Sequence, residues 1–394
     1  MIFRQTNKLD ENCKLAIPIY LSVGDGYNLL LREGTFLSKP IITRLLDYGY
    51  EYVYIEDDSL TGIELESLIP SNILISALSS IERFYVKVAA AIAPQGKKIG
   101  YVDAEIEKHI RLLKTISIDE LKNMAMLLAG DILSNNFKKY GSTLQLPYHF
   151  TLPAHVLRTS LISLLLAKEL GCERKALELL AFAGFLHDIG LMALGLPVGN
   201  LWRFYFDSET KNWKYHPALG KSILDYFEDV SDDVKNLILK HHEYRDGSGY
   251  PQNLKIRSAH TIQDLKASEQ KWTLGEVLTV ANDLDQFSWN ITTGAVDDRS
   301  FALMKLVAGK NTKYHPQVVQ MVERMVEPFP LGSMVGIVKF SGKRYSNLNA
   351  VVVRINENDY STFDLITLAN NMNGKTSNRI TINLNHGDII RRMF

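Results

Sequence analysis

The chain lacks several features that would assign it to a common class of protein. It has two cysteines among 394 residues, Cys13 and Cys172, and they stand far apart. Such a pair makes neither a disulfide framework nor a cysteine metal motif, and it is typical of a reducing compartment. The first residues form no apolar signal-peptide region, and no run of about 18 apolar residues exists to span a bilayer. We therefore expect a cytoplasmic protein with no membrane insertion.

An excess of charge of one sign is also missing. Lys and Arg together number 44, as do Asp and Glu, so the formal net charge is zero. Without a global field we expect no DNA binding, and any polyanion would need a local patch. Internal repeats and low-complexity tracts are absent as well. The length of 394 residues is enough for two or three domains with a buried core.

The apolar pattern changes twice along the chain. Short β-like runs come first, helical spacing then takes over, and β-like runs return with turns at Ser341-Gly342 and Asn373-Gly374. The predicted fold class is mainly α, with a central helical bundle between a small α+β N-terminal unit and a β-rich C-terminal unit that packs on it. The predicted divisions are an N-terminal module, a helical connecting segment, the helical domain and the C-terminal extension, at residues 1–70, 71–144, 145–330 and 331–394.

Histidines stand on four separate segments in a pattern that packing does not require. The helix predicted from Arg174 is almost wholly apolar, so it must be buried, and its end delivers His187 and Asp188 into the interior. A buried carboxylate is costly without a partner. Imidazole and carboxylate ligands suit first-row ions such as Fe, Mn, Co or Zn, and several helices can close on one point in a bundle. We predict a metal pair that Asp188 can bridge, the alternative being ordinary hydrogen-bonded histidines. The set is His155, His187, Asp188, His216, His241 and His242.

A glycine-rich loop follows the paired histidines His241 and His242. It runs from Asp246 to Pro251, and its glycines accept unusual dihedral angles, so it can approach a nucleotide closely. Tyr250 either stacks on a base or hydrogen-bonds a phosphate. A simple helix stop and turn is the alternative for this loop. On another helix, Arg158 lies three residues after His155 and shares its face.

Two motifs carry a family resemblance. Leu186-His187-Asp188-Ile189-Gly190 and the eleven-residue run from His241 to Pro251 resemble the HD-GYP family of the HD phosphohydrolase superfamily, whose members hydrolyse cyclic di-GMP. The resemblance covers about residues 145–330, and it extends more weakly to the module at residues 1–70, which looks like the regulatory segment that often precedes this domain. It implies an all-helical HD-type bundle in a bacterial signal-transduction protein, holding iron or manganese ions. The metal positions that it implies are His155, His187, Asp188, His216, His241, His242 and Asn282.

The resemblance also implies a reaction. Two divalent ions lower the pKa of a shared water, and the resulting bridging hydroxide attacks the phosphodiester in line, with Asp188 as the catalytic bridging ligand. The implied partner is cyclic di-GMP or a related cyclic dinucleotide, and a signalling protein partner and a homodimer stay open. The implied substrate-binding residues are Arg158, Asp246, Gly249, Tyr250 and Pro251.

Four positions depart from the family pattern. Leu191 stands where a lysine would meet the substrate phosphate, so a lysine restored there should tighten substrate binding. Asn282 stands at a carboxylate position, unless a shift of one residue brings in Asp283. The later Arg-x-Tyr is missing. Thr151 stands where members with a third metal carry glutamate, so we expect two ions.

These departures leave two functions open. One is an active, metal-dependent cyclic di-GMP phosphodiesterase. The other is a catalytically weak or inactive protein that acts as a cyclic dinucleotide receptor or interaction module and signals through its terminal units. A nucleotidase or another phosphohydrolase of the superfamily is a third reading, which the specific glycine-rich motif disfavours.

Overall fold

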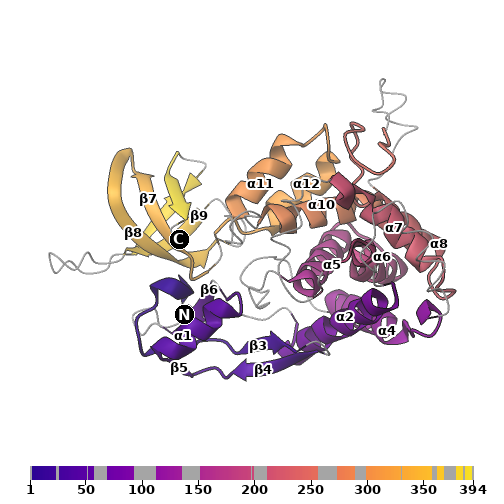
Figure 1. The fold of residues 1–394 in the computed structure, drawn as a ribbon. Helices are drawn as coiled ribbons and strands as arrows, with labels where there is room; N and C mark the ends of the chain where they lie inside the picture. Colours follow the sequence, from indigo (N-terminus) through magenta and orange to yellow (C-terminus); the bar gives the residue numbers. More distant parts are fainter. Residues whose placement is uncertain are drawn as a thin grey trace, which may run out of the picture.

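The structure is a computed structural model of the chain, and it has three parts (Figure 1). A small N-terminal unit of strands and one helix precedes a central helical body, and a C-terminal sheet follows. The described residues are 2–23, 26–50, 52–56, 69–92, 112–134, 151–196, 198, 211–255, 273–288, 299–329, 331–356, 362–367, 379–384 and 387–392.

The N-terminal unit consists of short antiparallel strand pairs and one helix. β1 pairs with β6, β2 with β5 and β3 with β4. Helix α1 (Lys39–Asp47) has Pro40 in its first turn, where the missing backbone donor costs nothing. The predicted small α+β unit is therefore confirmed. Its strands are β1 (Ile2–Gln5), β2 (Cys13–Lys14), β3 (Ile19–Ser22), β4 (Tyr27–Leu31), β5 (Phe36–Leu37) and β6 (Tyr52–Ile55), and a 3-10 turn, η1 (Thr6–Lys8), follows β1.

The central body is helical, as predicted. A single hydrophobic core runs through it from α2 to α12, so the predicted connecting segment, residues 71–144, shares its core with residues 145–330. Two 3-10 turns join the helices, η4 (Ile189–Leu194) and η6 (Lys211–Tyr215). The helices are α2 (Ser71–Ile92), α4 (Asp119–Ser134), α5 (Leu152–Glu169), α6 (Arg174–Leu186), α7 (His216–Leu224), α8 (Asp232–Lys240), α10 (Leu274–Phe287), α11 (Arg299–Ala308) and α12 (Pro316–Met325).

Local sequence sets both ends of α5. Thr151 Oγ1 accepts a hydrogen bond from the backbone nitrogen of Ala154 at 3.3 Å, and Pro153 occupies the first turn. At the other end Gly171 takes a φ of +80°, a left-handed conformation that stops helices. His155 is therefore held one turn inside a well-capped helix.

One described segment, Arg174–Leu194, is long and apolar enough to cross a membrane by length and composition. It covers α6 and η4. Of its most apolar window, 83% is buried inside the fold. Such burial is what an apolar core helix shows, because a helix that is hydrophobic all round must be covered on every side.

The C-terminal unit is a five-stranded antiparallel sheet in the order β10-β9-β8-β7-β11. The predicted turn at Ser341-Gly342 joins β7 to β8, and both residues have positive φ, 48° and 76°. Val351 packs in one core with Leu15 and Ile55 of the N-terminal unit, so the predicted packing of the two units is confirmed. The turn predicted at Asn373-Gly374 lies outside the described residues. The strands are β7 (Met334–Phe340), β8 (Lys343–Ile355), β9 (Thr362–Thr367), β10 (Arg379–Asn383) and β11 (Ile389–Arg392).

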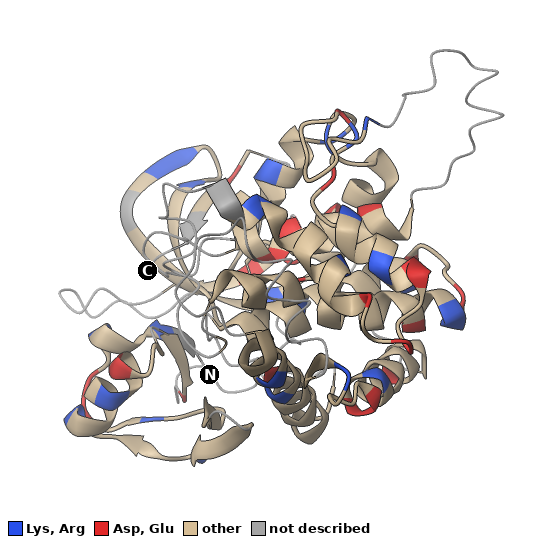
Figure 2. Cartoon of the chain, turned by 45° about the vertical axis from the view of Figure 1, so that its right-hand side comes forward, with Lys and Arg blue, Asp and Glu red and all other residues tan. Residues whose placement is uncertain are grey.

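Charged residues of both signs are interspersed over the helical body. Figure 2 shows blue and red segments side by side along its helices. The order of charged residues along these helices therefore reflects the balanced composition of the chain.

Candidate metal centre

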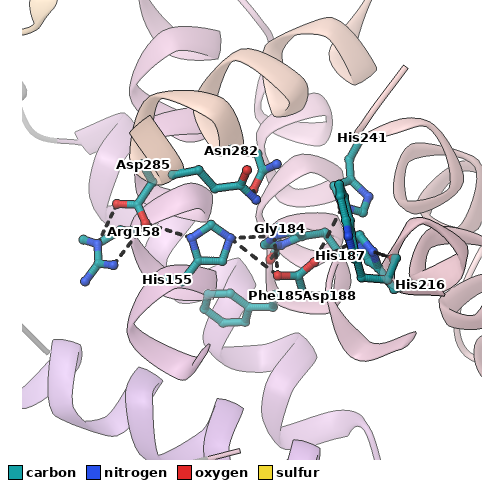
Figure 3. A network of polar contacts seen from close by, with 12 residues as sticks. His155, Arg158, Gly184, Phe185, His187, Asp188, His216, His241, Asn282 and Asp285 are labelled. Atoms are coloured by element: carbon teal, nitrogen blue, oxygen red, sulfur yellow. Dashed lines mark hydrogen bonds and ion pairs between the residues drawn. The ribbon is translucent and has the colours of Figure 1, made fainter. Parts of the chain in front are cut away.

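Six side chains from four segments meet in the interior of the helical body, and Figure 3 labels five of them. None of them exposes more than 3% of its surface. Each stands in or at the end of a helix, so the backbone holds it firmly. They are His155 in α5, His187 and Asp188 at the end of α6, His216 at the start of α7, and His241 and His242 after α8.

A glycine lets two of these segments approach each other. Gly190, in η4, lies against the first turn of α7, and a Cβ at this position would overlap the carbonyl oxygen of His216 and the amide of Gly220. Only a residue without a side chain allows this contact. As a result, Asp188 Oδ1 lies 3.1 Å from His216 Nε2.

Backbone carbonyls select the tautomer of three imidazoles. The Nδ1 atoms of His187, His216 and His241 lie 2.8, 2.6 and 2.6 Å from the carbonyl oxygen three residues earlier in the chain. A carbonyl oxygen only accepts, so each Nδ1 carries a proton and donates it. In the neutral ring, Nε2 is then left with a lone pair.

These lone pairs face one another across the centre. His216 Nε2 lies 3.0 Å from His241 Nε2, and His187 Nε2 lies 3.2 Å from His155 Nε2. Two lone pairs at such distances repel each other. A cation between the nitrogens removes the repulsion, and imidazole nitrogens arranged in this way are ordinary ligands of transition metals. The donor set therefore fits divalent transition ions.

Asp188 joins the two imidazole pairs. Its Oδ1 faces Nε2 of His216 and His241 at 3.1 and 3.6 Å, and its Oδ2 faces Nε2 of His187 and His155 at 3.4 and 3.5 Å. Buried Oδ2 has no hydrogen-bond donor among the described residues, which is costly unless a cation compensates. One carboxylate thus belongs to two potential ligand groups, Asp188 with His216, His241 and His242, and Asp188 with His155 and His187.

Burial and the shared carboxylate set the protonation of the centre. Burial lowers the pKa of His241 to about 3 and, with help from that imidazole, lowers the pKa of His242 well below its usual value. Burial opposes ionisation of Asp188 and of His187, yet their attraction depresses the pKa of Asp188 and raises the pKa of His187. The carboxylate therefore favours positive charge beside it, which a bound cation would supply.

Asn282 and Asp283, adjacent in α10, have different surroundings. Asn282 is fully buried, its Nδ2 has no hydrogen-bond partner among the described residues, and Figure 3 shows it beside the His155 and His187 pair. Asp283 instead accepts hydrogen bonds from the hydroxyls of Tyr244 and Tyr314, at 3.0 and 2.7 Å. The alternative in which Asp283 replaces Asn282 as a ligand therefore finds no support in the geometry.

The glycine-rich loop packs against the histidines. The Tyr250 ring stacks on the His242 ring, with centroids 4.5 Å apart and planes at 23°. Gly249 lies so close to the backbone of His242 and Tyr244 that a Cβ would overlap both. The predicted positive φ occurs at Gly247, at +80°, whereas Gly249 is needed for space. The loop therefore supports the metal centre from outside.

The two ends of this loop have simpler surroundings. Asp246 accepts hydrogen bonds from the backbone nitrogen and the hydroxyl of Ser248, at 2.9 and 2.6 Å, and its side chain is exposed. Pro251, half-buried, follows Tyr250. The substrate-binding roles of Asp246, Gly249, Tyr250 and Pro251 stay predictions.

Arg158, predicted to bind substrate, has another partner. It is buried, and its Nε and Nη2 donate to Oδ1 and Oδ2 of Asp285 at 2.6 and 3.0 Å. Both oxygens of this carboxylate therefore engage the guanidinium inside the protein. Arg158 is thus bound to Asp285 in the interior, and its substrate-binding role stays a prediction.

Leu191, which stands where the family pattern has a lysine, is buried. Its side chain is 2% exposed and packs in the main hydrophobic core. A lysine in its place would put an ammonium group in that core, where an unpaired charge is costly. We no longer expect Leu191→Lys to tighten substrate binding.

Three residues near the site escaped the sequence analysis. Asp285 ends an apolar stretch of α10, and the argument that a buried carboxylate needs a partner would have singled it out. Trp213 meets the Tyr250 ring edge-on, with centroids 5.3 Å apart. Lys214 places Nζ 5.7 and 5.8 Å from the ring centroids of Trp213 and Tyr250. No spacing rule predicts the last two contacts, because they join separate segments.

The structure defines a helical domain with a buried His and Asp cluster that could hold metal ions, and this cluster lies in the region that matches known proteins. Residues 131–260 match the family model described as HD domain. The chain is 27% identical over 189 residues to cyclic di-GMP phosphodiesterase PA4108 of Pseudomonas aeruginosa, covering 46% of this chain and 41% of that protein. It is 34% identical over 102 residues to the cyclic di-GMP phosphodiesterase response regulator RpfG of Xanthomonas campestris, covering 25% and 26%.

The chain thus contains an HD domain homologous to those of HD-GYP cyclic di-GMP phosphodiesterases. It spans less than half the length of these two curated relatives. Among solved structures, Bd1817, an HDG"Y"P protein of Bdellovibrio bacteriovorus, aligns with 82% of this chain and 97% of its own, at 20% identity and a TM-score of 0.40.

Proposed function

We propose that the protein is a metal-dependent phosphodiesterase of the HD-GYP type that hydrolyses cyclic di-GMP or a related cyclic dinucleotide. The observation that carries the proposal is the pair of imidazole groups that share the two oxygens of Asp188. Two ions held a few ångströms apart suit in-line displacement at phosphorus. The substrate class comes from the relatives, which are cyclic di-GMP phosphodiesterases.

The ligand groups divide between two ions. His216, His241 and His242 would hold one ion together with Asp188, and His155 and His187 would hold the other through the second oxygen of the same carboxylate, with Asn282 beside them. The mixed nitrogen and oxygen donor set suits iron or manganese. When bound, the ions activate a water molecule for attack and neutralise charge on the phosphodiester.

The family pattern has a phosphate-binding lysine where this chain has Leu191, and Lys214 offers a positive charge in its place. It is exposed, forms no ion pair with a carboxylate of the described residues, and lies beside Tyr250, which stacks on His242. We assign its ammonium group to a substrate phosphate. A charge-assisted hydrogen bond of about 1.5 kcal/mol corresponds to roughly tenfold in binding.

Lys214→Ala should therefore raise KM about tenfold and leave the metal content unchanged. Lys175→Ala, which removes an exposed lysine near the start of α6, is the matched control. Equal KM values for the two variants would remove Lys214 from the binding site.

A second candidate function is a receptor that binds the dinucleotide with little or no hydrolysis. Asn282 and Leu191 favour it, because one adds no charge to the ligand set and the other lies in the core. In this reading the terminal units, which pack together through Val351, would pass the signal on.

One experiment separates the two functions. Protein reconstituted with iron or manganese is incubated with cyclic di-GMP, and the products are resolved into linear dinucleotide and GMP. Turnover that a chelator abolishes supports the phosphodiesterase. Saturable binding without turnover supports the receptor, and neither binding nor turnover would refute both.

A further inference from the structure

The carboxylate of Asp285 touches the metal centre without belonging to either ligand group. Its Oδ2 lies 2.8 Å from Nδ1 of His155, and the residue is 2% exposed. The donor atoms that converge in the two groups come from other residues. Among the described contacts, Asp285 therefore meets the centre through the His155 ring (Figure 3).

This contact settles the tautomer of His155. The other rings with a known Nδ1 acceptor use a backbone carbonyl, whereas His155, in the middle of α5, uses a carboxylate from α10. A carboxylate accepts the Nδ1 proton more strongly than a carbonyl does, and it leaves Nε2 with its lone pair. That Nε2 is the atom that faces His187 Nε2 at 3.2 Å and Asp188 Oδ2 at 3.5 Å.

Arg158 keeps Asp285 in place. Two hydrogen bonds from its guanidinium engage both carboxylate oxygens, so Asp285 cannot turn towards the ions itself. The buried cation also offsets the buried anion, and Arg158, together with His155, holds the pKa of Asp285 below its usual value against the effect of burial. Arg158 therefore orients Asp285, and Asp285 orients the ring of His155.

We infer that Asp285, held by Arg158, is a positioning residue that governs one of the two ion sites, the one built on His155 and His187. The other site draws four donors from Asp188, His216, His241 and His242, and Asp285 touches none of them in the described contacts. The site on His155 and His187 has two imidazoles and the shared carboxylate, with neutral Asn282 beside it. It is the poorer of the two in donors, so the orientation of each ligand matters more there.

The inference rests on the metal-binding part of the proposed function and does not require hydrolysis. Loss of a residue that orients a ligand typically weakens metal binding about 10- to 100-fold. Asp285→Asn should therefore retain one tightly bound ion and lose affinity for the second by that factor. A residue needed only for folding would weaken both ions together.

The test is a titration of metal-free full-length protein with Mn(II), with free Mn(II) followed by its electron paramagnetic resonance signal. Asp283→Asn is the matched control, because Asp283 is an equally buried carboxylate of the same helix that contacts Tyr244 and Tyr314 instead. We expect two ions in the wild type and in Asp283→Asn, and one tight and one weakened ion in Asp285→Asn.

A second variant guards against misfolding. Asp285→Asn leaves Arg158 buried without its anion, whereas Asp285→Leu with Arg158→Met removes both charges, and such apolar replacement of a buried ion pair is often tolerated. It should show the same selective weakening of one ion. Equal weakening of both ions, no weakening, or fewer than two ions in the wild type would overturn the inference. If the wild type binds two ions, the variant binds one of them more weakly, and cyclic di-GMP is not cleaved, the inference about Asp285 holds. That result would contradict only the proposed phosphodiesterase activity.

Discussion

At the scale of single residues, the centre depends on where protons and lone pairs lie. Carbonyl oxygens take the Nδ1 protons of His187, His216 and His241, and their Nε2 atoms converge on Asp188. Burial keeps water from relieving the repulsion between these atoms. A cation would do so, and for that reason the cluster fits a metal site better than a set of core histidines.

Replacing His187 and Asp188 together tests this directly. His187→Ala with Asp188→Ala removes a donor from one ligand group and the carboxylate common to both, so both ions and any hydrolysis should be lost. Elemental analysis should give about two ions per chain in the wild type and none in the variant. His315→Asn, which keeps a side chain able to cap α12, should retain both. Two ions in the double variant would show that the centre lies elsewhere.

The pKa of Asp283 predicts how the stability of the fold depends on pH. Burial raises its pKa to about 6, even though two tyrosine hydroxyls favour the carboxylate. The unfolded chain loses this proton near pH 4, so between about pH 4 and 6 only the folded state holds it. Asp283 therefore makes the fold less stable as pH rises through this window, by on the order of 3 kcal/mol, with no further change above it.

The measurement is denaturant unfolding of metal-free protein from pH 4 to 7, compared with Asp283→Asn. The variant cannot titrate at this position, so the stability of the wild type minus that of the variant should fall as pH rises to 6 and then level off. The histidines titrate in both proteins and cancel in the difference. A flat difference would mean that Asp283 has an ordinary pKa in the folded protein.

At the scale of elements, the ends of helices place the ligands, and close approach between elements brings them together. Asp188 and His216 lie on neighbouring segments, η4 and α7, which meet at Gly190 and Gly220. Space for a side chain is missing there. This packing therefore requires glycine at position 190, and the positions of Asp188 and His216 depend on it.

Gly190→Ala should separate η4 from α7 and weaken the ion held by His216, His241 and His242. The cost in stability should reach about 1–3 kcal/mol, as for other side chains forced into a filled space. Gly130→Ala is the control, since a Cβ there meets nothing within 4 Å and alanine favours a helix by roughly 0.5–1 kcal/mol. Thermal melting measures the stability of both variants, and Mn(II) titration measures their metal affinity. Full metal binding by Gly190→Ala would show that the contact can relax.

At the scale of the whole molecule, the metal centre connects distant parts of the chain. Its ligands span residues from His155 to His242, and the N-terminal unit reaches the same body through Tyr27, whose hydroxyl lies 3.1 Å from Thr151 Oγ1 at the start of α5. The C-terminal sheet packs on the N-terminal unit in turn. Stability and metal binding should therefore be coupled.

Metal binding should raise the melting temperature of the full-length protein. An ion that binds only the folded chain adds about 3–4 kcal/mol at 100 to 1,000 times its Kd. With Asp188 as the sole carboxylate in the ligand groups of the described residues, the second ion is opposed by less negative charge. Melting curves against Mn(II) should thus continue to shift after the first ion has bound. The same titration of His187→Ala with Asp188→Ala should show no shift, and an equal shift would point to binding outside the centre.

Local sequence determined much of this protein. Apolar spacing and turn residues predicted the helical body, the strands on either side and the hairpin turn at Ser341-Gly342, because these depend on neighbours along the chain. The histidines and Asp188 were predicted as a metal set from residue type and family resemblance, and the structure brings them together.

Only the tertiary structure decided what the other residues near the site do. Arg158 shares a helix face with His155, yet its orientation towards Asp285 depends on how α10 lies across α5. Leu191 follows the His-Asp pair closely in sequence but packs into the core, and Lys214 reaches Tyr250 from another segment. Spacing along one helix or loop determines which residues share a face. The partner that meets that face is set by long-range packing, which no local pattern encodes.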